Sequence, residues 1–486
     1  MSSIGHPQAP DPPPPEPRKK DSEKRDPTWE PGSLDSFPRE EITALVSQAE
    51  AKRARKETLQ VWALGLGLGC VALGLPTERL WASEDIVAQV AGDGPSAFGL
   101  VVPLASLLHH LAGMSAERAL FLVAALSYGL LLPALRSLMR TIGFPHGLSL
   151  AASSAVVLSP GVWLCATLPL DFIPGALGAT LLARSLFQTE QRTKQGYQWR
   201  ASTLTLLAFL LGPENLLLIP AVAWAVSSHP SSRRLPRFFP AFNLILVLAV
   251  ALVVLMVSPG GSLHKWRDLL EALLAGGSMD PILKLRWLVW LPAYLGLSAA
   301  GLWFLFFSRR AAEETPPPGW VVYWCLAALV PVLGGTLPHG PVAGFLAPMA
   351  AIGIADWLMR MDREERVVPW AMGLLAAQLG LTLGATYWMY QTDPHAAFRR
   401  VATEVLEPSD RVVTSDPDHH YLLERRWGVS VAVQPQDFEQ PISPADTLIF
   451  DGWDNNGYES ELLQFGQALL LTPEGLSPNR RGERRP

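Results

Sequence analysis

Long apolar segments separated by short polar loops are the feature that most constrains how this chain can fold. They recur from Leu59 to Tyr390, and most are close to the roughly 20 residues that a helix needs to cross a bilayer. A strand with one exposed face would instead alternate in polarity. The pattern therefore predicts an α-helical polytopic membrane protein. Hydrophobic residues make up 49% of the chain, and no basic face suggests a nucleic-acid partner.

The segments predict about eleven spans. Residues 96–113 are apolar but contain Pro103 and the pair His109 and His110, so we expect an interfacial or re-entrant helix there. Segment 201–228 is expected to form two short helices that meet at residues 212–215. The predicted spans are 59–77, 118–136, 147–166, 171–187, the pair within 201–228, 238–258, 285–308, 320–336, 342–358 and 368–389.

Basic residues fall in alternate loops and so orient the predicted spans. A cluster at 52–56 precedes the first span. Further groups of basic residues begin at positions 136, 184, 233, 309 and 360. Because Lys and Arg near span ends stay cytoplasmic, the N-terminus is expected inside and the C-terminus outside. The loop 259–286 is the exception, since it carries Lys265 and Arg267 on the expected outer side.

Four regions follow from this pattern. Residues 1–56 are expected to form a cytoplasmic tail that is disordered over about residues 1–40, where proline and charge are frequent. Residues 39–56, just before the first span, have a helical pattern. Residues 57–390 form the membrane domain, and residues 391–476 form a small extracytoplasmic α/β domain. Strands are expected at 411–414, 429–433 and 447–450, with a helix near 457–466. Residues 477–486 are expected to be a disordered tail. The three cysteines, Cys70, Cys165 and Cys325, lack metal-site spacing and are interpreted as packing residues.

Two adjacent carboxylates, Glu84 and Asp85, lie in the first outer loop, soon after the first span. Acidic groups held close to the bilayer often bind a ligand or transfer a proton. The structural alternative is a pair of solvated loop charges, which the residues alone favour slightly. Asp93 stands in Gly92-Asp93-Gly94, a strong turn signal.

Other polar residues fall in further loops on the expected outer side. Asp171 begins the fourth span, where it could also serve as a helix N-cap. Glu214 lies at the tip of the broken hairpin, and His339 lies in a turn between two prolines. His109 and His110 could bind a metal ion, although a histidine at the interface with satisfied hydrogen bonds is the commoner case. Four loops that are far apart in sequence thus each bring a polar group to one membrane surface.

The order of these motifs resembles that of the GT-C superfamily of polytopic glycosyltransferases, close to the protein mannosyltransferase and aminoarabinose transferase type. The similar segments include Glu84-Asp85 after the first span, a Pro-Leu helix with histidines at 103–113 and Ser159-Pro160. They continue with the hairpin at 211–220 and the late proline turn at 337–341. Three features of the family pattern differ. Glu84 precedes Asp85, the hairpin lacks a basic residue beside Glu214, and the arginine or tyrosine usual before the late proline turn is missing.

The resemblance implies an enzyme of the cytoplasmic (inner) membrane that transfers a sugar from a polyprenyl-phosphate donor to a lipid, glycan or protein acceptor. It implies Asp85 as general base and Glu84 as an orienting group. These two carboxylates, with His109 and His110, are also candidate ligands of a divalent cation. Donor and acceptor contacts would come from Asp171, Glu214 and His339, with Lys265 and Arg267 replacing the missing phosphate ligands. The alternative is a non-catalytic membrane scaffold or accessory subunit of a surface-polysaccharide system.

Overall fold

In the computed structural model, the described residues form helices and a five-stranded sheet. The described residues are 39–74, 87, 90–91, 100–167, 172–188, 194–228, 294–307, 319–334, 339–362, 366–391, 404, 406, 411–413, 423, 428, 432–433, 448–451, 468–472 and 475–478. The predicted span at 238–258 and the predicted helix at 457–466 lie outside them. The helical region contains the buried core, and the strands form one sheet.

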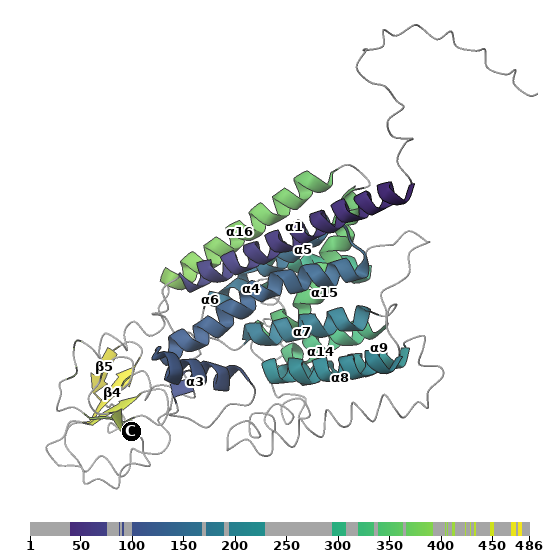
Figure 1. Ribbon diagram of the computed structural model, residues 1–486. Coiled ribbons are helices and arrows are strands. Elements are labelled where there is room, and N and C mark those ends of the chain that lie inside the picture. The colour runs from purple at the N-terminus through teal and green to yellow at the C-terminus, as the bar shows by residue number, and fades with distance from the viewer. Residues whose placement is uncertain are drawn as a thin grey trace, which may run out of the picture. The chain divides into compact units, whose positions relative to one another are not determined.

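Three helices form the centre of the helical region: α4 (Ala116–Ile142), α7 (Phe172–Phe187) and α15 (His339–Asp362). Helix α7 packs against both of the others and against α8 (Lys194–Leu211), as Figure 1 shows. The start of α4 follows from its sequence, because the Ser115 hydroxyl accepts a hydrogen bond from the Arg118 amide at 3.3 Å. Its end follows from Gly143, whose φ of 107° suits a glycine cap.

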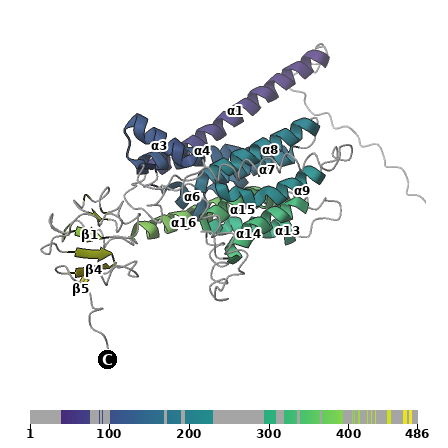
Figure 2. The same ribbon diagram turned by 90° about the horizontal axis from the view of Figure 1, so that it is seen from below.

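Close helix packing in this core depends on glycine. Helix α13 (Ala299–Phe307) crosses α15 where Gly301 faces Gly353. A Cβ atom added at Gly353 would overlap the carbonyl oxygen of Gly301, so neither helix could approach as closely with a larger residue. Helices of membrane proteins commonly use small residues in this way. Figure 2 shows α13 and α14 (Gly319–Gly334) beside α15.

The predicted span 147–166 is not one continuous helix. It consists of α5 (His146–Val157) and α6 (Pro160–Thr167), which meet at an angle of 63°. Pro160 explains the break, since proline has no amide hydrogen and its ring clashes with the preceding turn. The carbonyl groups freed at the break find other donors: the Tyr128 hydroxyl donates to Val157 at 3.0 Å, and the Thr382 hydroxyl donates to Leu158.

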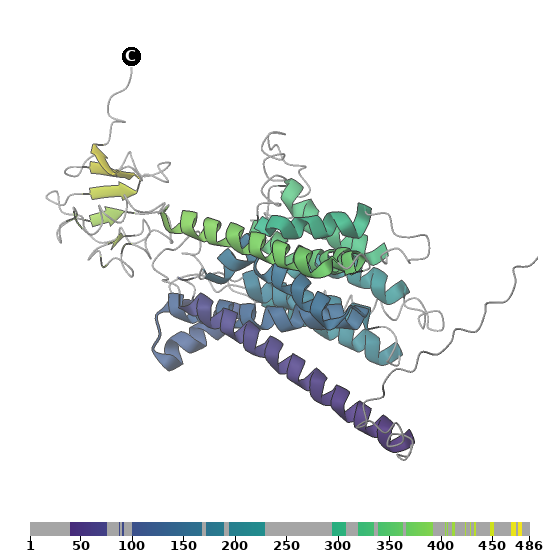
Figure 3. The same ribbon diagram turned by 90° about the horizontal axis from the view of Figure 1, so that it is seen from above.

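Helix α16 (Val367–Gln391) supplies polar side chains to two helix breaks, the first being the α5–α6 break that Thr382 contacts. The second break lies at η3 (Gly296–Ser298), where Gly296 has a φ of 56°. The Gln378 side chain accepts a hydrogen bond from the Leu297 amide at 2.9 Å and donates to the Leu295 carbonyl at 3.0 Å. Figure 3 shows α16 alongside the other helices. Backbone groups in an apolar environment need such partners.

Two described helices are long and apolar enough to cross a membrane, namely α4 and residues 367–387 of α16. The bent pair α5–α6 is a third candidate if it counts as one span. Within the α4 window 72% of residues are buried, against 11% for α16, so α4 is central and α16 peripheral. The predicted helical architecture with membrane-span candidates is confirmed, while the number of spans and their orientation stay predictions.

The predicted break at residues 212–215 is confirmed. Helix α8 ends at Leu211, the 3-10 helix η1 (Pro213–Leu218) follows, and α9 (Ile219–Ser228) begins directly after it. The prediction for His339 was wrong: this residue is not in a turn but is the first residue of α15. Pro341 explains the difference, because proline is well suited to the first turn of a helix.

The C-terminal sheet has the order β2-β1-β3-β4-β5. Three predicted strands are present as β1 (Arg411–Val413), β2 (Ala432–Val433) and β3 (Leu448–Asp451). Two further strands were not predicted: β4 (Ala468–Thr472), parallel to β3, and β5 (Gly475–Pro478), antiparallel to β4. Strand β5 ends at Pro478, two residues beyond the predicted end of the domain at 476.

Candidate functional site

The starts or ends of several helices converge around the N-terminal end of α7. The amide of Leu100, which precedes α3 (Val101–Ala112), donates a hydrogen bond to the carbonyl of Leu210 near the end of α8, at 2.7 Å. Leu100 follows the predicted loop of Glu84 and Asp85 in the sequence. The contact joins the start of α3 to the end of α8.

Asn215 ties the α8–η1 turn to α7. Its side-chain amide donates hydrogen bonds to the carbonyls of Gly175 at 3.0 Å and Ala208 at 2.8 Å. Gly175 lies in the first turn of α7, directly after the segment that contains Asp171. Asn215 is buried, so these hydrogen bonds also compensate for removing its amide from solvent. Glu214, the adjacent residue, is therefore held near the start of α7.

Helix α15 begins at the same place. A Cβ atom at Gly344 would lie 3.0 Å from the Cβ atom of Ala176, so the two helices touch within about two turns of both their first residues. His339, as the first residue of α15, is thereby brought to the start of α7. The backbone around Glu214, the start of α7 and His339 thus belong to one end of the helical region.

The structure describes only part of the predicted site. Glu84, Asp85, Asp171, Lys265 and Arg267 lie outside the described residues. Glu214 and His339 are placed by their helices, and their side chains are not described. Convergence of the acidic side chains therefore stays a prediction.

His109 and His110 both lie in the last turn of α3. The Nδ1 atom of His109 is hydrogen-bonded to the carbonyl oxygen of Met114. A carbonyl can only accept, so Nδ1 carries the hydrogen and Nε2 of the neutral ring keeps its lone pair. The two rings lie 4.8 Å apart between centroids. The Nε2 atom of His109 is therefore the ring atom that could bind a metal ion.

A metal centre is not supported by the part of the chain that the structure describes. Within it, no group of three or more His, Cys, Asp or Glu residues is close enough to hold an ion. His109 and His110 by themselves form no such group, and their predicted partners Glu84 and Asp85 are not described. The predicted cation thus remains an expectation.

Helix α3 has the features of a helix at a membrane surface. Its 12 residues give a length of about 18 Å, too short for a span. Four leucines repeat at helical spacing on one exposed side: Leu100, Leu104, Leu107 and Leu111. A row of exposed leucines suits contact with lipid, in line with the predicted interfacial or re-entrant helix.

Asn215 was not among the predicted site residues. A single amide in the apolar run Leu216-Leu217-Leu218 is a signal for a buried hydrogen-bonding role. Its partners could not be identified, because Gly175 is 40 positions away in the sequence.

No protein-family model and no curated protein sequence matches the chain. Solved structures do match. Over 85% of this chain and 92% of the other, the structure is similar to ArnT from Cupriavidus metallidurans bound to undecaprenyl phosphate, with a TM-score of 0.52 and 13% identity.

Two longer proteins also match. The Archaeoglobus fulgidus oligosaccharyltransferase, in complex with Zn and sulfate, has a TM-score of 0.46 and 15% identity over 77% of this chain and 62% of its own. The mycobacterial arabinofuranosyltransferase AftD has a TM-score of 0.43 and 16% identity over 74% and 29%. This chain thus spans less than two thirds of either. The similarity to ArnT shows that this chain shares the fold of that protein.

Proposed function

We propose that this protein is a membrane glycosyltransferase that uses a polyprenyl-phosphate-linked sugar as donor. The observation that carries the proposal is the fold shared with ArnT over most of both chains. ArnT was crystallised with undecaprenyl phosphate, a lipid of the proposed donor class. The convergence of helix ends around the start of α7 supports a site at that end.

In this proposal the site faces the outer side of the cytoplasmic membrane. The Asp85 carboxylate removes the proton of an acceptor hydroxyl, whose oxygen forms the new bond to the anomeric carbon of the sugar. The bond from that carbon to the phosphate oxygen breaks, and polyprenyl phosphate leaves with the electron pair. Glu84 orients Asp85, and Lys265 and Arg267 stabilise the charge on the phosphate.

Asn215 has a positioning role in this scheme. It holds the turn that carries Glu214 against the start of α7, the helix that follows Asp171 in the sequence. Asp171, Glu214 and His339 would then contact the donor headgroup or the acceptor from the convergent helix ends. The acceptor is a lipid, glycan or protein hydroxyl at the outer surface.

The decisive experiment compares surface glycans, glycolipids and glycoproteins by mass spectrometry. Five strains are needed: wild type, a deletion, Asp85→Asn, Glu84→Gln and Asp93→Asn. The last is a matched control, since it makes the same chemical change in the same loop at a turn residue. We expect one sugar to disappear from both the deletion and the Asp85→Asn strain, and to persist in the control.

Equal protein levels in the membrane must accompany that result. If only the deletion removes a sugar while Asp85→Asn behaves as wild type, Asp85 is not the base. Loss in the deletion with no effect of either Asp85→Asn or Glu84→Gln favours the non-catalytic scaffold.

A further inference from the structure

A cavity of about 330 Å³ lies between α7 and α8, away from the convergent helix ends. It is lined by two arginines, a tryptophan, a threonine and two leucines: Arg184, Arg200, Trp199, Thr203, Leu181 and Leu204. Ligand pockets in proteins begin at about this volume. The combination of cations with aliphatic side chains would suit a ligand that is both anionic and partly apolar.

Arg184 has an unmet hydrogen-bonding capacity. Its Nε atom is buried and, among the residues that the structure describes, has no hydrogen-bond partner. Leaving such a donor unsatisfied is unfavourable, and more so when the group is charged. No described carboxylate forms an ion pair with Arg184. An anion in the cavity would accept a hydrogen bond from Nε and would also balance the charge of Arg184.

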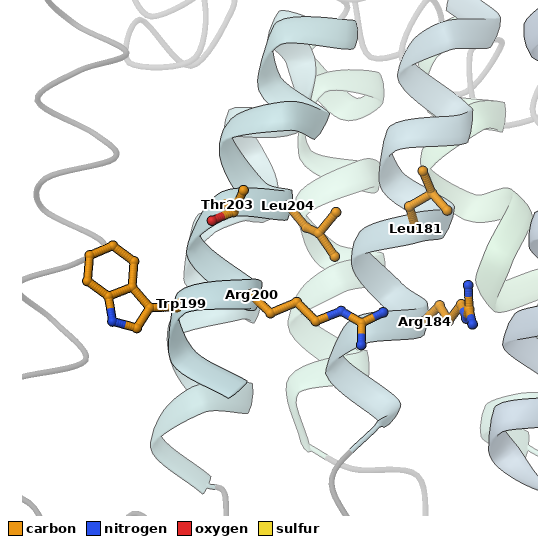
Figure 4. A pocket seen from close by; sticks show the side chains of 6 residues that line it. All are labelled: Leu181, Arg184, Trp199, Arg200, Thr203 and Leu204. Carbon is orange, nitrogen blue, oxygen red and sulfur yellow. The ribbon is translucent and has the colours of Figure 1, made fainter. Parts of the chain in front are cut away.

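Arg200 brings a second positive charge to the same cavity. In Figure 4 its side chain runs from α8 toward α7, near the point where Arg184 leaves α7. The Arg184 side chain continues beyond α7, and Trp199 points to the opposite side of α8. Because both arginines line the cavity and like charges repel, an anion in the cavity would be attracted to both positive charges.

We propose that this cavity binds a phosphate-bearing anion. Guanidinium groups present several N–H donors in a plane and match phosphate oxygens well. Leu181 and Leu204 would contact aliphatic carbon next to the phosphate, as in the acyl chains of a phospholipid. Trp199 is 55% exposed, which suits a side chain at a membrane surface. The Thr203 hydroxyl is a further hydrogen-bond donor.

This site is distinct from the proposed transferase site, and the inference does not depend on the transfer reaction. Arg184 lies near the C-terminal end of α7, whereas the convergent helix ends surround its N-terminal end. The predicted orientation of the spans places this end of α7 at the cytoplasmic surface, where anionic lipid headgroups attract basic residues. A phospholipid and free phosphate share the chemistry proposed here, and the experiment separates them.

The test measures ligand binding to the full-length protein in a neutral detergent by native mass spectrometry. Three probes are titrated: phosphatidylglycerol, a diacylglycerol with the same acyl chains, and inorganic phosphate. The variants are Arg184→Gln and Arg200→Gln, and the control is Arg366→Gln, an exposed arginine outside the cavity. We expect each cavity variant to weaken phosphatidylglycerol binding about tenfold or more, with no change for the control.

The outcomes are distinct. Arginine-dependent binding of phosphatidylglycerol, without binding of diacylglycerol, supports the proposal with a lipid as the source. Arginine-dependent binding of inorganic phosphate that competes with the lipid supports it with a soluble source. Binding of phosphatidylglycerol that is the same in wild type and in both variants would overturn the proposal, as would the absence of binding by both phosphate probes.

A cavity variant that leaves both arginines in place tests the proposal even if the arginine variants misfold. Leu204→Trp adds bulk to the cavity lining and changes no charge. We expect it to reduce binding of phosphatidylglycerol while the thermal midpoint of the protein stays close to that of wild type. Undiminished binding by a folded Leu204→Trp protein would count against this cavity.

Discussion

Single buried polar side chains stabilise the irregular backbone of this apolar fold. Gln378 lies in α16 and is fully buried, yet its partners are the backbone of residues 295–297 in another part of the chain. Thr382, one turn further along α16, donates a hydrogen bond to the Leu158 carbonyl at the break between α5 and α6. These two residues explain why polar groups repeat along an otherwise apolar helix.

Replacing Gln378 with leucine should destabilise the protein. The change removes the acceptor for the Leu297 amide and the donor for the Leu295 carbonyl and leaves both groups without these hydrogen bonds. We expect a loss of about 1–3 kcal/mol, measured as a lower thermal midpoint in detergent. Ala377→Leu is the control, since it adds a leucine at the next position, which is exposed, and should leave the midpoint unchanged. Equal midpoints for Gln378→Leu and wild type would show that these hydrogen bonds contribute little.

At the scale of elements, the distance between helices is set by small residues. Helices α13 and α15 touch at Gly301 and Gly353, and α1 (Arg39–Leu73) touches α4 at Gly65 and Gly129. In contrast, Gly380 in α16 has no atom within 4 Å of the place where a Cβ atom would lie. Glycine is therefore required at some helix crossings and replaceable elsewhere.

Gly353→Ala should separate α13 from α15. The added methyl group would overlap the Gly301 carbonyl, and overpacking of this kind costs about 1–3 kcal/mol. The expected result is a lower thermal midpoint, measured together with the yield of monodisperse protein. The matched control, Gly380→Ala, adds the same methyl group in open space and should be neutral. A Gly353→Ala protein as stable as the control would mean that the helices adjust at no cost.

At the scale of the whole molecule, the predicted orientation can be tested by chemical labelling. The cysteines Cys70, Cys165 and Cys325 are first replaced by alanine, and then one cysteine is introduced as Ser22→Cys or Ser409→Cys. An impermeant maleimide should label position 409 in intact spheroplasts and position 22 only after lysis, because the basic loops remain cytoplasmic. The reverse pattern would invert the predicted topology and move the proposed transferase site to the cytoplasmic side.

Much of the helical architecture was predictable, because hydrophobicity is a local property of the sequence. The helices at 116–142, 172–187, 319–334 and 367–391 correspond to predicted spans, and the break at 212–215 was found from Gly212 and Pro213. Strands β4 and β5 were not predicted. The segment Ala468–Thr472 is a short apolar run without alternating polarity, and such a run becomes recognisable as a strand only beside β3.

The sequence by itself determined that this chain forms apolar helices, and proline and glycine determined where several of them break, since both effects act within a few residues. Only the tertiary structure decided what satisfies those breaks. The pairing of Gln378 with residues 295–297 and of Asn215 with Gly175 joins positions tens of residues apart. The meeting of Arg184 and Arg200 around one cavity likewise depends on how α7 and α8 pack. Such contacts depend on the packing of the whole helical region, and no local pattern in the sequence encodes them.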